Sequence, residues 1–103
     1  MIFARVVGNV VSTNKDAKLV GKKLLLVQAV DLAGAAKGNP IVAIDAVGAG
    51  EGEFVLLVQG SSARQTAVTE GNPADCTIVA IIDYVEQGGK LVFEKAKDVY
   101  RAP

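Results

Sequence analysis

Histidine and tryptophan are both absent from this 103-residue chain, and two Tyr and three Phe are its only aromatic residues. Without His the chain lacks the usual general acid–base group, the Ser-His-Asp and Cys-His nucleophile systems, and most zinc sites. With so few aromatic rings it has little on which to stack single-stranded nucleic acid. The composition therefore argues against an enzyme, and we expect no catalytic residue, no cofactor and no bound metal.

Net charge is also absent, because 11 Lys and Arg balance 11 Asp and Glu. A broad basic face for nucleic acid is therefore not expected.

The single cysteine, Cys76, excludes an internal disulfide and favours a reducing compartment. It directly precedes an apolar run, so we expect a buried and unreactive thiol. Apolar runs are much shorter than the roughly 20 residues that cross a bilayer, and residues 1–8 do not resemble a signal peptide. We expect a cytoplasmic protein with no membrane partner.

Short runs of Val, Ile and Leu, separated by Gly, Asn, Pro and Asp, predict β-strands along the chain. The predicted strands are 2–11, 23–30, 41–47, 53–59, 77–85 and 90–94, with Gly8 as a bulge and Gly88-Gly89 as a hairpin turn. One short helical turn is expected at 61–65, and the segment 95–103 is expected as a short helix or a loose tail. These elements predict an all-β protein, a small five- to six-stranded β-barrel over residues 1–94, followed by a charged tail at 95–103.

Three predicted strands are apolar on both faces: 24–27, 54–58 and 78–82. A barrel has only one inner face, so the outer face of such strands needs a second cover. In a chain of this length another subunit is the expected cover, which predicts an oligomer.

Three groups of residues have a functional and a structural interpretation. Gly48-Ala49-Gly50-Glu51-Gly52 is spaced differently from a phosphate-binding fingerprint and precedes a strand, which favours a turn. Ser61 and Ser62 lack a base, which favours close backbone packing over nucleophilic attack. Asp31, Asp45 and Asp83 are more readily explained by backbone caps or pairing with Arg5 and Arg64 than by a metal.

Several short motifs follow one another along the chain in a recognisable order. They are Arg5-Val6, Gly8, Val10-Val11-Ser12-Thr13; Lys23-Leu24-Leu25-Leu26-Val27; Asp45, Val47-Gly48-Ala49-Gly50, Gly52-Glu53; Gly60-Ser61-Ser62-Ala63-Arg64-Gln65; and Ile78, Ile81-Ile82-Asp83. From about residue 1 to about residue 94 the chain resembles the EutN/CcmL family, the pentameric vertex proteins of bacterial microcompartment shells. Leu91-Val92-Phe93 after the Gly-Gly turn resembles the metabolosome members more than the carboxysome members.

The resemblance implies a barrel related to the OB fold and a homopentamer around a narrow axial pore. It implies a structural role without catalysis, at the fivefold corners of a shell tiled by hexameric proteins within the cytoplasm. It places Gly60, Ser61, Ser62, Ala63 and Arg64 at the subunit interface near the fivefold axis. Gly48, Ala49, Gly50 and Gly52 are expected in a neighbouring loop that also approaches a partner. Arg64 is expected to pair across the interface with Asp45 or Asp83.

Two other functions stay open at this point. An OB-like barrel is often a binding module for nucleic acid or another ligand. A basic stripe with exposed aromatic residues would favour that function, and the sequence lacks both. A small enzyme that uses carboxylates and Lys would need a polar cleft with shifted carboxylate pKa values.

Overall fold

The computed structural model describes residues 1–13, 17, 21–60, 76–95 and 99–100, and the structural statements below concern these residues. Its strands are β1 (Ile2–Val10), β2 (Leu24–Ala29), β3 (Ile41–Asp45), β4 (Phe54–Gln59), β5 (Cys76–Ile81), β6 (Tyr84–Gln87), β7 (Lys90–Glu94) and β8 (Val99–Tyr100). The predicted all-β class is confirmed. Within those ranges, no helix has the length and hydrophobicity to cross a bilayer.

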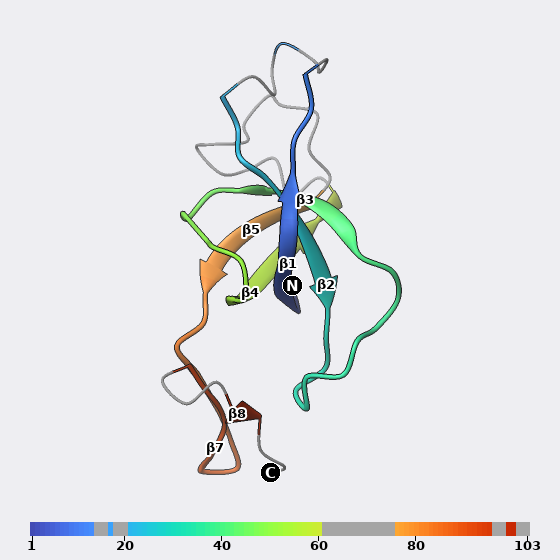
Figure 1. Ribbon diagram of the computed structural model, residues 1–103. Helices are drawn as coiled ribbons and strands as arrows, with labels where there is room; N and C mark the ends of the chain where they lie inside the picture. The colour runs from blue at the N-terminus through green and yellow to red at the C-terminus, as the bar shows by residue number, and fades with distance from the viewer. Residues whose placement is uncertain (14–16, 18–20, 61–75, 96–98, 101–103) are drawn as a thin grey trace.

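The first five strands close a barrel in the order β1-β2-β3-β5-β4, with β4 pairing back to β1 (Figure 1). All pairs are antiparallel except β3 and β5, which share two parallel pairs, Ile44 with Thr77 and Asp45 with Ile78. The register of β1 against β2 shifts between Val6 and Gly8, which confirms the bulge expected at Gly8. This is the predicted small barrel, with five strands.

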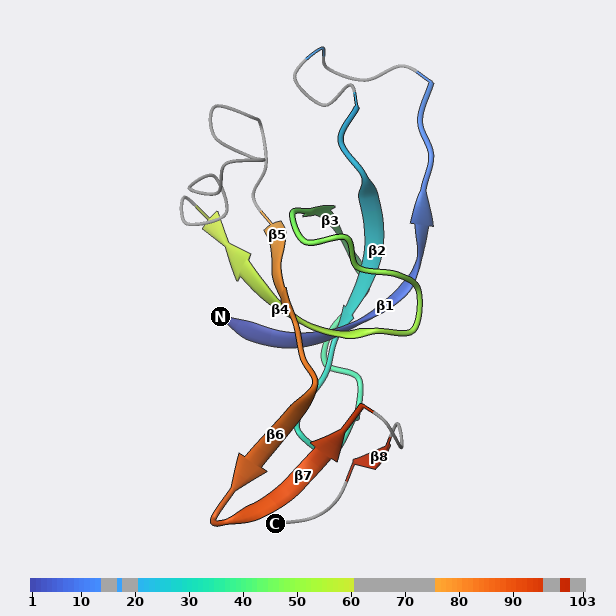
Figure 2. The ribbon, with the colours of Figure 1, turned by 90° about the vertical axis from the view of Figure 1, so that its left-hand side faces the viewer.

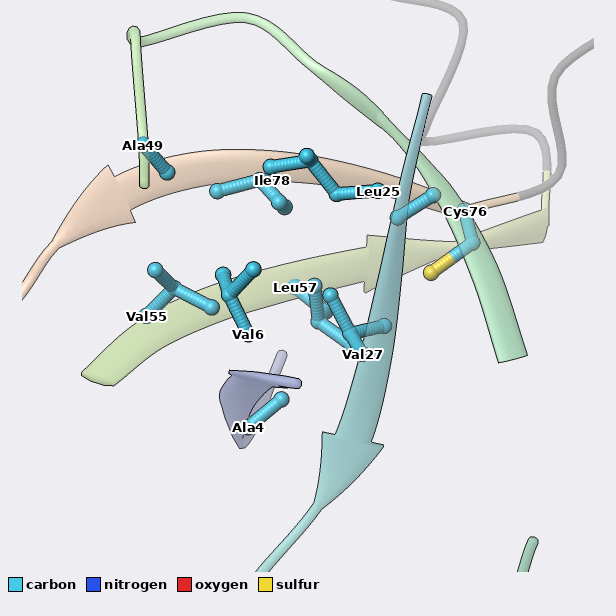
Figure 3. Packing of buried hydrophobic residues seen from close by; sticks show 10 residues of the cluster. Ala4, Val6, Leu25, Val27, Ala49, Val55, Leu57, Cys76 and Ile78 are labelled. Carbon is cyan, nitrogen blue, oxygen red and sulfur yellow. The ribbon is translucent and has the colours of Figure 1, made fainter. Parts of the chain in front are cut away.

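Inward-facing residues of all five strands fill the barrel. Its buried cluster consists of Ala4, Val6, Leu25, Val27, Ala43, Ala49, Val55, Leu57, Cys76 and Ile78 (Figure 3). Ala4 and Val6, or Leu25 and Val27, are two residues apart, because alternate side chains of a strand point to the same face. Cys76 is a buried thiol, as the sequence predicted.

The strands β6, β7 and β8 form a second sheet outside the barrel (Figure 2). β6 and β7 are the predicted hairpin, and Gly88 and Gly89 turn it with φ of 63° and 78°. The predicted single strand 77–85 is wrong, because the chain changes partner within it, from β4 of the barrel along β5 to β7 of the hairpin along β6. The residues of β8 belong to the expected tail and pair with β7. The helical turn expected at 61–65 lies outside the described residues.

A second buried cluster joins this sheet to the outer face of the barrel. It contains Val30, Phe54, Ile82 and Phe93, with Phe3, Leu56 and Val85 packed against it. The ring centroids of Phe54 and Phe93 are 4.4 Å apart. On the outer face of β4, therefore, the chain itself buries Phe54, whereas Leu56 is half-buried.

The outer face of β2 and β3 differs from that of β4. Leu26 and Val42 are cross-strand partners there, and Val42 is 45% exposed. The side chain of Leu26 is half-buried. This pair remains an apolar outer surface of the barrel, of the kind from which the sequence predicted an oligomer.

Candidate functional site

The glycine-rich loop between β3 and β4 folds back onto the barrel. Gly48 and Gly52 have φ of 76° and 88°, a left-handed conformation that favours glycine. Between them Ala49 is fully buried in the barrel cluster. The Glu53 carboxylate accepts a hydrogen bond from the Gly50 amide at 2.8 Å, which closes the turn. The loop is thus the structural turn that the sequence favoured over a phosphate-binding loop.

Lys23 holds this loop to the end of β3. Its Nζ donates a 2.5 Å hydrogen bond to the carbonyl of Ala49 and lies 3.6 Å from Asp45 Oδ2. Asp45 Oδ1 accepts a hydrogen bond from the Val47 amide at 3.0 Å. The Asp45 side chain is only 1% exposed, so its charge is satisfied inside one chain. Sequence reasoning named Lys23 only as part of a strand and a motif, and missed it as the partner of Asp45.

Arg5 and Glu53 connect the loop to the second sheet. Arg5 Nη1 donates to the Gly52 carbonyl at 2.7 Å, and the guanidinium lies 5.6 Å and 5.7 Å from the ring centroids of Phe54 and Phe93. Glu53 Oε2 accepts a 2.8 Å hydrogen bond from Lys95 Nζ. Together these contacts fix the position of the hairpin base relative to the barrel.

The Glu53–Lys95 pair shifts both pKa values. The hydrogen bond from Lys95, followed by that from the Gly50 amide, lowers the pKa of Glu53. The hydrogen bond to Glu53 raises the pKa of Lys95. Both shifts favour the charged forms, so the pair is ionised at neutral pH.

Gly60 directly follows β4, is exposed and has a φ of 66°. A hollow of about 350 Å³ lies at this end of the barrel, lined by Ile41, Val42, Gln59 and Cys76. Ser61, Ser62, Ala63 and Arg64, which complete the expected interface segment, lie outside the described residues.

The two glycine segments lie at opposite ends of β4. The loop at 48–52 precedes that strand and Gly60 follows it. A strand of this length spans about 20 Å, so the structure does not bring the loop and Gly60 together within one chain.

The three Asp residues considered for a metal are dispersed. The Asp31 carboxylate accepts hydrogen bonds from the Ala33 and Ala35 amides at 2.9 Å each, which caps its own turn. Asp83 is exposed between β5 and β6, and its carbonyl accepts from the Lys95 amide at 2.8 Å. In the described part of the chain, no three His, Cys, Asp or Glu residues are grouped to hold a metal ion.

The family described as ethanolamine utilisation protein EutN/carboxysome matches residues 1–83. The bacterial microcompartment shell vertex protein EutN of Salmonella typhimurium is 47% identical over 95 residues, 92% of this chain and 96% of that protein. The carboxysome shell vertex protein CcmL of Nostoc sp. PCC 7120 is 48% identical over 102 residues. These identities are nearly equal, so membership of the metabolosome subgroup stays a prediction.

Solved structures agree with the sequence comparisons. The structure of Nostoc CcmL superposes with a TM-score of 0.88 at 47% identity and covers 92% of this chain and 100% of that one. The GrpN pentameric microcompartment shell protein of Rhodospirillum rubrum has a TM-score of 0.76 at 41% identity and covers 84% of this chain and 99% of that one. Sequence and fold match over nearly the whole length, and this chain therefore belongs to the EutN/CcmL family.

Proposed function

We propose that this chain is a structural shell protein whose homopentamer occupies the fivefold vertices of a bacterial microcompartment in the cytoplasm. The observation that carries the proposal is membership of a family whose matched relatives are named shell vertex proteins. The matched GrpN structure is described as pentameric. In this role the chain contributes shape and contacts, and no catalytic step is assigned to it.

The physical basis of this role is symmetry. A flat sheet of hexameric proteins cannot close into a shell, and corners of fivefold symmetry provide the closure. A ring of identical subunits forms when one surface of each chain binds a different surface of the next, and the rotation returns to the start. The exposed Val42 and its half-buried partner Leu26 support burial of part of the barrel surface in such a ring.

Gly60 and the four residues that follow it are proposed to lie at the interface near the fivefold axis. The hollow beside Gly60 supports this place, because it gives a neighbouring segment room to approach the barrel. For the proposed intersubunit pair of Arg64, Asp83 is the better partner. Its side chain is exposed, whereas that of Asp45 is buried and engaged with Lys23.

The proposal is tested by the native mass of the purified protein, from native mass spectrometry or light scattering after a sizing column. Five chains of 10.6 kDa give a ring of about 53 kDa. We expect that mass, and we expect the ring to convert open sheets or tubes of hexameric shell proteins into closed shells seen by electron microscopy. A monomer at every concentration tested, or shells that close equally well without the protein, would contradict the proposal.

A further inference from the structure

We propose that the outer hairpin carries a docking socket for a basic, arginine-containing segment of a partner protein. The socket is a hollow of about 340 Å³, and its described lining residues are Asp83, Tyr84, Glu86, Leu91, Glu94 and Lys95. It belongs to the second sheet, outside the barrel (Figure 2). The proposal goes beyond the ring proposed above, because it concerns a surface for a different protein.

Two side chains give the socket an apolar contact surface. Tyr84 is 61% exposed and Leu91 is 36% exposed, although both belong to paired strands. Across the hairpin, Tyr84 is paired with Glu94 and Leu91 with Glu86. A cation that approaches either apolar group therefore meets a carboxylate beside it. Tyr is also among the residues that contribute most to binding in protein interfaces.

The charge of the socket is negative, although the chain as a whole is neutral. Three of the described lining residues are carboxylates, and Lys95 is the one cation among them. The Lys95 ammonium lies 2.8 Å from the carboxylate of Glu53, outside the socket, so its charge is matched there. Even with Lys95 counted, carboxylates outnumber cations in this lining, and a basic partner is complementary to it.

An arginine suits this surface better than a metal ion does. Among the residues that the structure describes, no three His, Cys, Asp or Glu are grouped to hold a metal. A guanidinium is planar and extended, so it stacks on an aromatic ring while its donors reach carboxylates at the side. The chain uses such stacking at the hairpin base, where the Arg5 guanidinium lies 5.6 Å and 5.7 Å from the ring centroids of Phe54 and Phe93. The exposed ring of Tyr84 offers the same contact to a partner.

The socket is held in place before a partner binds. Phe93 of β7 is 1% exposed, and its ring centroid is 4.4 Å from that of Phe54 in the barrel. The Lys95 amide donates a hydrogen bond to the Asp83 carbonyl at 2.8 Å, which closes the base of the hairpin. A surface that is already ordered binds a partner at a lower entropic cost.

The test uses the full chain and a dye-labelled peptide that repeats the tripeptide Arg-Leu-Gly, with binding followed by fluorescence anisotropy at low salt. We expect this peptide to bind about threefold or more tightly than a peptide that repeats Lys-Leu-Gly, because Arg stacks and forks to carboxylates. A peptide that repeats Glu-Leu-Gly should not bind. Binding of the Arg peptide should weaken as the salt concentration rises.

Variants of the socket locate the contact. Asp83→Asn and Glu86→Gln should each weaken binding of the Arg peptide by about threefold to tenfold. Tyr84→Ser should weaken it about tenfold, whereas Tyr84→Phe keeps the ring and should stay within about twofold of wild type. Glu51→Gln is the matched control, since it removes an exposed carboxylate outside the socket, and it should change nothing. Circular dichroism and native mass should be the same for all variants.

Equal binding of the Arg peptide by wild type and by the socket variants would overturn the proposal. Binding that appears only after Lys97 and Arg101 are both replaced by Gln would overturn it in favour of the tail of this chain. Loss of binding in magnesium chloride, but not in sodium chloride of equal ionic strength, would overturn it in favour of a divalent cation. An intact ring that does not bind the peptide contradicts only the socket, whereas a monomer that binds it contradicts only the proposed function.

Discussion

Replacing Asp45 by Ala removes a buried carboxylate that the structure uses inside one chain. The side chain accepts a hydrogen bond from the Val47 amide at 3.0 Å and lies 3.6 Å from Lys23 Nζ. A hydrogen bond to a charged group contributes about 1.5–3 kcal/mol. Because half of the Lys23 side chain is exposed, the ion pair adds less than about 1 kcal/mol. We expect Asp45→Ala to lower the free energy of unfolding by about 2–3 kcal/mol.

The loss is measured by urea unfolding followed by circular dichroism, at the same chain concentration for all variants because assembly adds apparent stability. At this chain length the melting temperature should fall by about 10 °C or more. Asp45→Asn is the matched control. It keeps an oxygen that accepts from Val47 but removes the charge and places an NH2 group near Lys23, so it should lose less stability than Asp45→Ala.

The reasoning is refuted if Asp45→Ala unfolds at the same urea concentration as wild type but dissociates the ring. That result would mean that Asp45 acts between subunits, as the sequence first indicated. An unstable variant that still forms rings when folded would instead support the intrachain role.

Two further predictions concern the second sheet. Phe93→Ala should lower the free energy of unfolding, measured in urea, by about 3–5 kcal/mol, because the ring is 1% exposed and packed on Phe54. Phe93→Leu is the control and should lose less. A loss below about 1 kcal/mol for Phe93→Ala would contradict this packing. Glu53→Gln should be less stable than wild type at pH 7. Because the pKa of Glu53 is lower when the chain is folded, its contribution is complete above the ordinary carboxyl value of 4.5 and is lost as the pH falls through the lowered value. Urea unfolding at pH 7 and pH 3 checks this, and an equal difference at both pH values would count against it.

Much of the barrel could be predicted because its signals are local. Short β-branched runs, glycine at Gly8 and the Gly88-Gly89 pair each act over a few residues, and the structure has the expected bulge and turn there. The glycine loop at 48–52 could be interpreted as a turn for the same reason, since a positive φ is a property of one residue.

The apolar run at 78–82, inside the predicted strand 77–85, misled the strand prediction for a non-local reason. Its first part pairs with β4 inside the barrel, whereas Ile82 enters the outer cluster with Phe54 and Phe93. Apolar character indicates that a residue is buried but not which of two cores buries it. The partner of Asp45 was likewise undetermined, because Lys23 lies 22 positions away in sequence and reaches it only through the pairing of β2 with β3.

The sequence by itself determined the β class, the main strands, the turns and the lack of His chemistry, because residue type and spacing decide these features. Its motifs also carried the family resemblance that the comparisons confirm. The tertiary structure alone decided which apolar faces the chain covers itself and which remain outside. It showed that the hairpin helps to bury Phe54 of β4, and that Leu26 and Val42 form an apolar outer surface. The physical reason is that burial depends on which distant strands meet, and no local pattern encodes that meeting.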